Sequence, residues 1–74
     1  MYREMKQEII EQVPTHLINN RDFWMVIAEA ITPDDWRIVE VDGFVGWDVN
    51  HLNQCGFIVV TACKGDELGI IHTD

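Results

Sequence analysis

The sequence predicts an α+β domain in which two N-terminal helices pack on one face of a small, mainly antiparallel sheet of three or four strands. Apolar residues recur at helical spacing over the first 31 positions, whereas after position 35 they follow the spacing of strands. The 74 residues suffice for only one hydrophobic core, so we expect a single domain over residues 1–74.

The first helix is predicted over the N-terminal segment and ends at Pro14, because proline disfavours the helical conformation of the residue before it. Its apolar positions share one face: Tyr2, Met5, Ile9, Ile10 and Val13. Its acidic positions lie on the opposite face: Glu4, Glu8 and Glu11.

A second helix is predicted over about residues 21–31, with Asn19 or Asn20 as its N-cap. Most of its circumference is apolar, and its clearly outward charges are Asp22 and Glu29. A helix with so narrow a polar stripe lies in a core or beneath another chain. The next residues, Thr32 to Asp35, have the pattern of a single capped turn.

A β-hairpin is predicted around Asp42-Gly43, because this dipeptide favours the positive φ angles of a two-residue turn. The flanking strands are residues 36–41 and 44–49. This register places Val41 opposite Phe44 and puts Trp36 and Trp47 on one face, where their rings stack.

Further along the chain, the segment Val49–Cys55 fits either a short helix or a loop. Residues 57–63 are apolar on both faces and predict a central strand. A turn at Gly65-Asp66, with Lys64 opposite Glu67, leads into a last strand over residues 68–72. Two helices cover only one face of such a sheet, so its other face is left for a partner or a second copy.

The sequence favours a binding protein over an enzyme. His51, Cys55, Cys63 and His72 lack the close pairs of recognised zinc sites, and the acidic surroundings of Cys55 do not suit a reactive thiolate. No phosphate-binding glycine motif and no EF-hand pattern occurs. We therefore predict no catalytic residue, no metal and no cofactor. The N-terminus lacks the apolar region of a secretory signal, so we expect a cytoplasmic protein without membrane association.

Net charge points to the kind of partner. Thirteen acidic and five basic residues give −8 at pH 7, a field that repels nucleic acid and attracts basic protein surfaces. We expect clustered carboxylates, with two indoles as anchors, to contact such a partner: Glu4, Glu8, Glu11, Asp22, Glu29, Asp34, Asp35, Trp24 and Trp36.

In size, acidity and lack of a catalytic set, the chain resembles the small inhibitors of phages and mobile elements, including anti-restriction proteins, anti-CRISPR proteins and other DNA mimics. This resemblance lies in composition alone. It implies an inhibitor or regulator that occupies a basic, nucleic-acid-binding surface of another protein. The alternative is an assembly module that forms a homodimer or joins a complex through its uncovered apolar sheet face.

Overall fold

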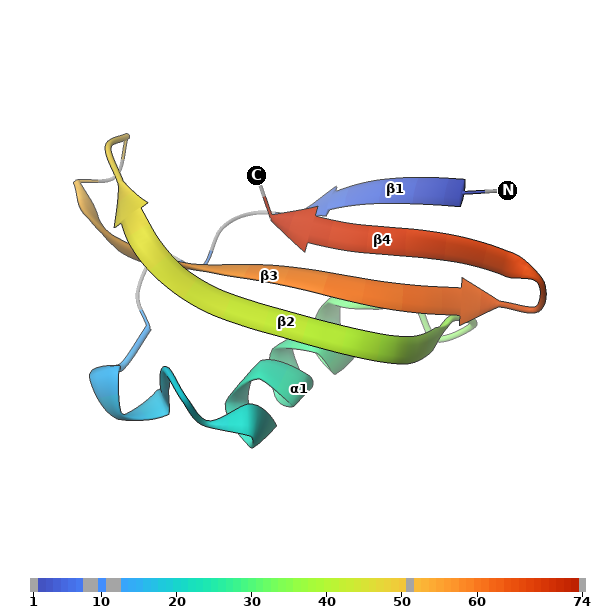
Figure 1. Cartoon of the computed structure of the whole chain (residues 1–74), viewed down its shortest axis with the longest axis horizontal. Coiled ribbons are helices and arrows are strands. Elements are labelled where there is room, and N and C mark those ends of the chain that lie inside the picture. The colour runs from blue at the N-terminus through green and yellow to red at the C-terminus, as the bar shows by residue number, and fades with distance from the viewer. Residues whose placement is uncertain (1, 8–9, 11–12, 51, 74) are drawn as a thin grey trace.

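The computed structural model describes residues 2–7, 10, 13–50 and 52–73. Its elements are, in chain order, β1 (Tyr2–Gln7), the 3₁₀ helix η1 (Thr15–Leu17), α1 (Arg21–Ile31), β2 (Arg37–Asp48), β3 (Asn53–Lys64) and β4 (Glu67–Thr73). The strands form one mixed sheet in the order β1-β4-β3-β2, and α1 packs on one face of it (Figure 1). Strand β1 runs parallel to β4, and the other pairs are antiparallel.

The prediction of two N-terminal helices was wrong, because the first segment contains a strand. β1 pairs with β4 over its whole length, with Arg3 beside Gly69 and Met5 beside Ile71. Between Arg3 and Gln7 only Met5 is apolar, so this part of the segment offers little apolar face to a helix, and the edge of β4 supplies hydrogen-bond partners for an extended chain. Ile10 then exchanges two backbone hydrogen bonds with Gly56, of 2.7 and 3.0 Å.

The second predicted helix is confirmed as α1. Asn20 caps it, because its Oδ1 accepts a hydrogen bond of 3.1 Å from the backbone N–H of Phe23. Trp24 and Ala28, one turn apart, are buried against the sheet. The Trp24 indole N–H donates a 2.9 Å hydrogen bond to the carbonyl of Ile18, so this large ring is buried with its polar atom satisfied.

The predicted hairpin at Asp42-Gly43 was wrong. β2 runs through this dipeptide without a turn, and Gly43 pairs with Ile58 of β3. The indole of Trp24 lies directly over Gly43, where a Cβ atom would fall only 2.7 Å from the ring atom Cε2. Glycine is therefore needed here for close packing of α1 on β2, and not for a positive φ.

The stacked Trp36–Trp47 pair is also absent. Trp36 precedes β2 and is buried, and its ring lies over Gly69 of β4. Trp47 lies near the other end of β2 and is 66% exposed. Once β2 is continuous, the two indoles are eleven positions apart along an extended chain, too far for their rings to meet.

The two actual hairpins join β2 to β3 and β3 to β4. In the segment Val49–Cys55, which fitted either a short helix or a loop, residues 49, 50 and 52 form turns and residues 53–55 begin β3, whereas His51 lies outside the described residues. Asp48 shapes the turn by accepting a 2.8 Å hydrogen bond from the N–H of Asn50. The predicted pairing of Lys64 with Glu67 is confirmed, and Gly65 between them has a φ of 61°.

The sheet has one covered and one open face. Alternate residues of β3 and β4 point toward α1 and are buried, notably Ile58, Val60 and Ile71. The intervening residues point to the other side, which no described element covers (Figure 1).

Candidate functional site

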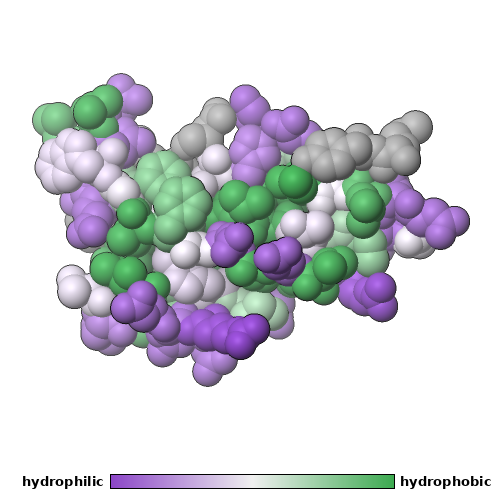
Figure 2. Space-filling view, viewed as in Figure 1, coloured by the Kyte–Doolittle hydropathy of each residue, from purple (hydrophilic) through white to green (hydrophobic). Residues whose placement is uncertain are grey.

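The open face of the sheet is apolar across its middle. Strand register places its residues in adjacent pairs: Phe44 beside Phe57, Val59 beside His72, Thr61 beside Ile70, and Cys63 beside Leu68. Figure 2, which looks onto this face, shows hydrophobic side chains over the central strands. Phe44 is 54% exposed and stacks on Phe57, with ring centroids 5.5 Å apart. Large apolar groups are thus available to a partner.

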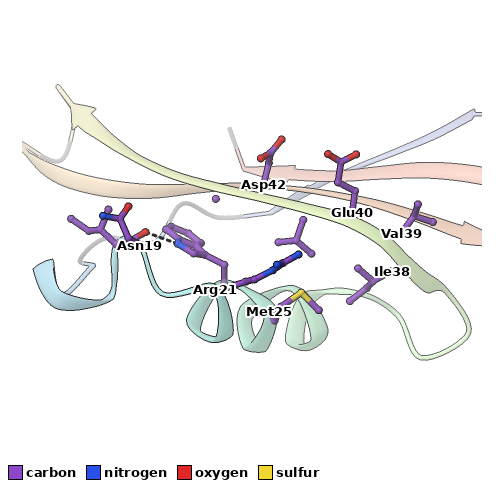
Figure 3. A pocket seen from close by; sticks show the side chains of 11 residues that line it. Asn19, Arg21, Met25, Ile38, Val39, Glu40 and Asp42 are labelled. Carbon is purple, nitrogen blue, oxygen red and sulfur yellow. Dashed lines mark hydrogen bonds between the residues drawn. The ribbon is translucent and has the colours of Figure 1, made fainter.

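Two carboxylates border this apolar surface along β2. Glu40 pairs with Thr61 and Asp42 with Val59, so both occupy the open face with Phe44. Figure 3 shows both side chains on the side of β2 away from α1. Both are exposed, and the described residues include no ion-pair partner for either one. These carboxylates are therefore available to cationic groups of another molecule.

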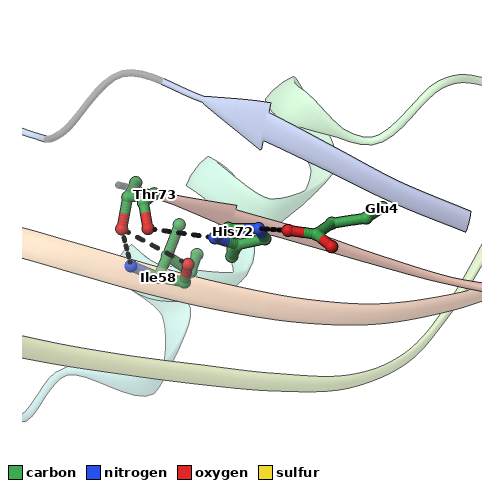
Figure 4. A network of polar contacts seen from close by, with 4 residues as sticks. All are labelled: Glu4, Ile58, His72 and Thr73. Carbon is green, nitrogen blue, oxygen red and sulfur yellow. Dashed lines mark hydrogen bonds and ion pairs between the residues drawn. The ribbon is translucent and has the colours of Figure 1, made fainter.

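The opposite border of the open face carries a polar network (Figure 4). His72 Nε2 lies 2.7 Å from Glu4 Oε1, and His72 Nδ1 lies 3.2 Å from the carbonyl of Thr73. The Thr73 hydroxyl accepts a 3.0 Å hydrogen bond from the N–H of Ile58. The network ties β1, β4 and β3 together, so Glu4 is already engaged within the fold.

A groove lies between α1 and β2, on the covered side of the sheet. Its volume is about 600 Å³. Apolar side chains from both elements line it, including Met25, Ile38 and Val41. Figure 3 shows Arg21 on the α1 side of β2, opposite to the side of Glu40 and Asp42.

The carboxylates expected to cluster are distributed over several surfaces. Asp22 and Glu29 are exposed on α1, whereas Asp34 and Asp35 lie in the turn before β2. Glu4 lies on β1 across the sheet, and the predicted contacts at Glu8 and Glu11 lie outside the described residues. The single ridge of Glu4, Glu8 and Glu11 required a helix that does not form.

Asp35 is partly neutralised by a neighbour. Its Oδ2 lies 2.7 Å from Lys64 Nζ. The hydrogen bond from this ammonium lowers the pKa of the Asp35 carboxyl below its ordinary value. Asp35 is therefore a less available contact than Glu40 or Asp42.

The predicted indole anchors have little surface to offer. Trp24 is 6% and Trp36 is 7% exposed, and Arg3 lies over the Trp36 ring at 5.9 Å from its centroid. The exposed aromatic residues are instead Phe44 and Trp47, neither of which is among the predicted contact residues. Alternation that continues from Glu40 to Asp48 without a shift places Phe44 on the face of the acidic residues and could have identified it. The same alternation places Trp47 on the face of Val41 and Val45, so it does not predict the exposure of Trp47.

The residues considered for zinc do not come together. Cys55 and Cys63 lie on the same strand, eight residues and therefore about 26 Å apart. His51 lies outside the described residues. Within the described ranges, no three His, Cys, Asp or Glu side chains are grouped to hold a metal ion.

No known protein family matches this chain, and neither a characterised protein nor a solved structure is detectably similar to it. Within residues 2–7, 10, 13–50 and 52–73, no helix has both the length and the apolar character needed to span a bilayer.

Proposed function

We propose that this protein is a non-catalytic binding protein whose open sheet face docks on a partner that carries an apolar patch bordered by Arg or Lys. In this proposal it acts as an inhibitor or regulator of that partner. The supporting observation is the adjacency of exposed Phe44 to the carboxylates of Glu40 and Asp42 on one face. The acidic residues proposed to contact the partner are thus Glu40 and Asp42 of β2, in place of the acidic residues expected from the sequence.

The two kinds of side chain would contribute differently. Full burial of an exposed Phe or Leu side chain stabilises a complex by about 1.5–3 kcal/mol before the costs of association. Phe44 and Leu68 each have about half of this surface available. Carboxylates at the border mainly accelerate encounter with a basic surface and exclude acidic partners.

The same charges favour a foreign partner over a second copy. Two copies would bring together bodies that each carry −8, with Glu40 and Asp42 at the contact. Added salt screens both the repulsion between two copies and the attraction to a basic partner. Binding to a basic partner should therefore fall with salt, whereas homodimer formation should rise. A surface that normally binds nucleic acid is a suitable target, because carboxylates and phosphates use the same Arg and Lys groups.

The proposal is tested with immobilised protein and lysate of the native host. One variant reverses charge on the open face, with Glu40→Lys and Asp42→Lys. Its matched control makes the same net change on α1, with Asp22→Lys and Glu29→Lys. A third variant, Phe44→Ala, removes the exposed ring.

We expect a protein that is retained by the wild type and by the α1 control, and lost from both open-face variants. Its retention should also decrease between about 0.05 and 0.5 M salt. Equal loss from both charge-reversed variants would show that only net charge matters. Retention by all of them would reject the open face as the contact surface.

A further inference from the structure

Among the described strands, only β3 pairs with β2, which leaves the other edge of β2 without a described partner strand. Strand β2 is the last strand in the order β1-β4-β3-β2, and it extends over 12 residues. Every second residue of such a strand directs its N–H and C=O groups away from the sheet. A long edge of this kind can bind another strand through backbone hydrogen bonds.

The groove between α1 and β2 runs beside this free edge. Its lining includes Met25 of α1 with Ile38 and Val41 of β2. Its volume of about 600 Å³ lies within the range of about 300–1,000 Å³ that is usual for ligand pockets. Methionine adapts its shape to different apolar groups, which suits a groove that receives side chains of another chain.

A strand added at this edge would project side chains alternately to two different environments. One set would enter the groove toward Met25, Ile38 and Val41, where the polar side chains of Asn19 and Arg21 also form part of the lining. The other set would lie on the open side, where Glu40 and Asp42 stand (Figure 3). Arg21 lies on the groove side, so cations are disfavoured there and favoured beside the carboxylates.

We propose that the groove and the free edge of β2 bind an extended peptide segment with alternating apolar and basic residues, which pairs with β2 as a fifth strand. This inference goes beyond the proposed function, because it uses the edge and the groove rather than the apolar open face. The two surfaces share only the carboxylates at their border.

The edge discriminates against a second copy of the chain. Antiparallel pairing of two β2 strands would bring Glu40 and Asp42 of both copies onto the same face, where like charges repel. Charged side chains on an edge strand are a usual defence against pairing with an identical strand. A basic peptide meets attraction from the same carboxylates.

The test is an NMR titration of the full chain with a blocked seven-residue peptide that alternates lysine and valine. Two matched peptides serve as controls. One has the same length with glutamate in place of lysine, and the other is the lysine peptide with every amide N-methylated. We expect saturable shifts of α1 and β2 amides with the lysine peptide, and slower hydrogen exchange at the outward amides of β2. Both matched peptides should bind at least about tenfold more weakly, because one lacks the charge and the other the backbone donors.

Variants locate the contact. Met25→Lys should weaken peptide binding at least about tenfold, because Met25 lines the groove. Val26→Lys is the control: Val26 is the next residue of α1, is exposed and does not line the groove, so the affinity should change by less than about twofold. Glu40→Gln with Asp42→Asn removes two exposed charges and should weaken binding by about 2- to 30-fold. The matched control is Asp22→Asn with Glu29→Gln, which should have little effect.

Three results would overturn the inference: no saturable binding at millimolar peptide, equal binding of the N-methylated peptide, or shifts confined to the open-face residues of β3 and β4. Phe44→Ala separates this inference from the proposed function. It should abolish capture of the partner protein and leave peptide binding within about twofold, because Phe44 is absent from the groove.

Discussion

Substitution of Gly43 by alanine tests the packing of α1 on β2, on which both proposed surfaces depend. A Cβ atom at this position would overlap the six-membered ring of Trp24, with Cε2 at 2.7 Å. The indole is buried, and its N–H is held by the carbonyl of Ile18, so the ring has little freedom to move away. The methyl group must therefore displace α1 or bend β2.

The expected magnitude follows from two opposing effects. Overpacking a core typically costs about 1–3 kcal/mol. Alanine also reduces the conformational entropy of the unfolded chain. This effect raises the free energy of unfolding by about 0.4–1 kcal/mol where the native backbone conformation suits alanine. We expect Gly43→Ala to lower the free energy of unfolding by about 1.5 kcal/mol. For a domain of this size, the corresponding decrease in Tm is about 6–12 °C.

The assay is thermal and urea unfolding followed by circular dichroism, with Gly46→Ala as the control. Gly46 lies on the same strand, and a Cβ there would lie 3.4 Å from Phe57 Cε2, an ordinary contact. We expect its effect to stay within about 0.5 kcal/mol. In a Trp24→Leu background, Gly43→Ala should cost no more than this control, because the clashing ring is gone. An equal cost in both backgrounds would refute the packing of Trp24 on Gly43.

Three further substitutions test separate contacts. Asn20→Ala removes the α1 N-cap and should cost about 1 kcal/mol in urea unfolding; an unchanged midpoint would show that the cap is not formed. Ile71→Ala empties a fully buried site and should cost about 2–5 kcal/mol; a cost below about 1 kcal/mol would contradict its core position. Lys64→Ala should raise the pKa of Asp35 toward its ordinary 3.8 in an NMR titration. Because folding lowers this pKa in the wild type, the contact stabilises the fold above about pH 3.8, and its contribution is lost as pH falls through the lowered value. An unchanged Asp35 titration would refute the ion pair.

Local patterns predicted those elements whose signals agree with one another. The helix at residues 21–31 has a capping Asn and a continuous apolar face, and both signals place it where α1 lies. The turn with Gly65 between Lys64 and Glu67 forms in the predicted register, although the ammonium of Lys64 makes its ion pair with Asp35. The two faces of β3 were correctly read as apolar, although only one of them is buried beneath α1.

The errors arise where one residue type serves two physical purposes. Glycine after aspartate is typical of a tight turn, but Gly43 is required by an indole from another element. Such a contact is long-range and leaves no trace in the local pattern. The N-terminal strand was missed because its partner, β4, lies more than sixty residues away along the chain. Because of these two errors, the sequence placed the candidate site on carboxylates of the predicted helices, whereas the structure places it on the open face beside Phe44.

The most direct test of the proposed function is the set of amide resonances that a captured partner protein perturbs in the isotopically labelled chain. The proposal predicts the largest changes around Phe44, Val59 and Ile70, on the open face of three adjacent strands. Changes confined to the exposed side of α1, around Asp22 and Glu29, would contradict it.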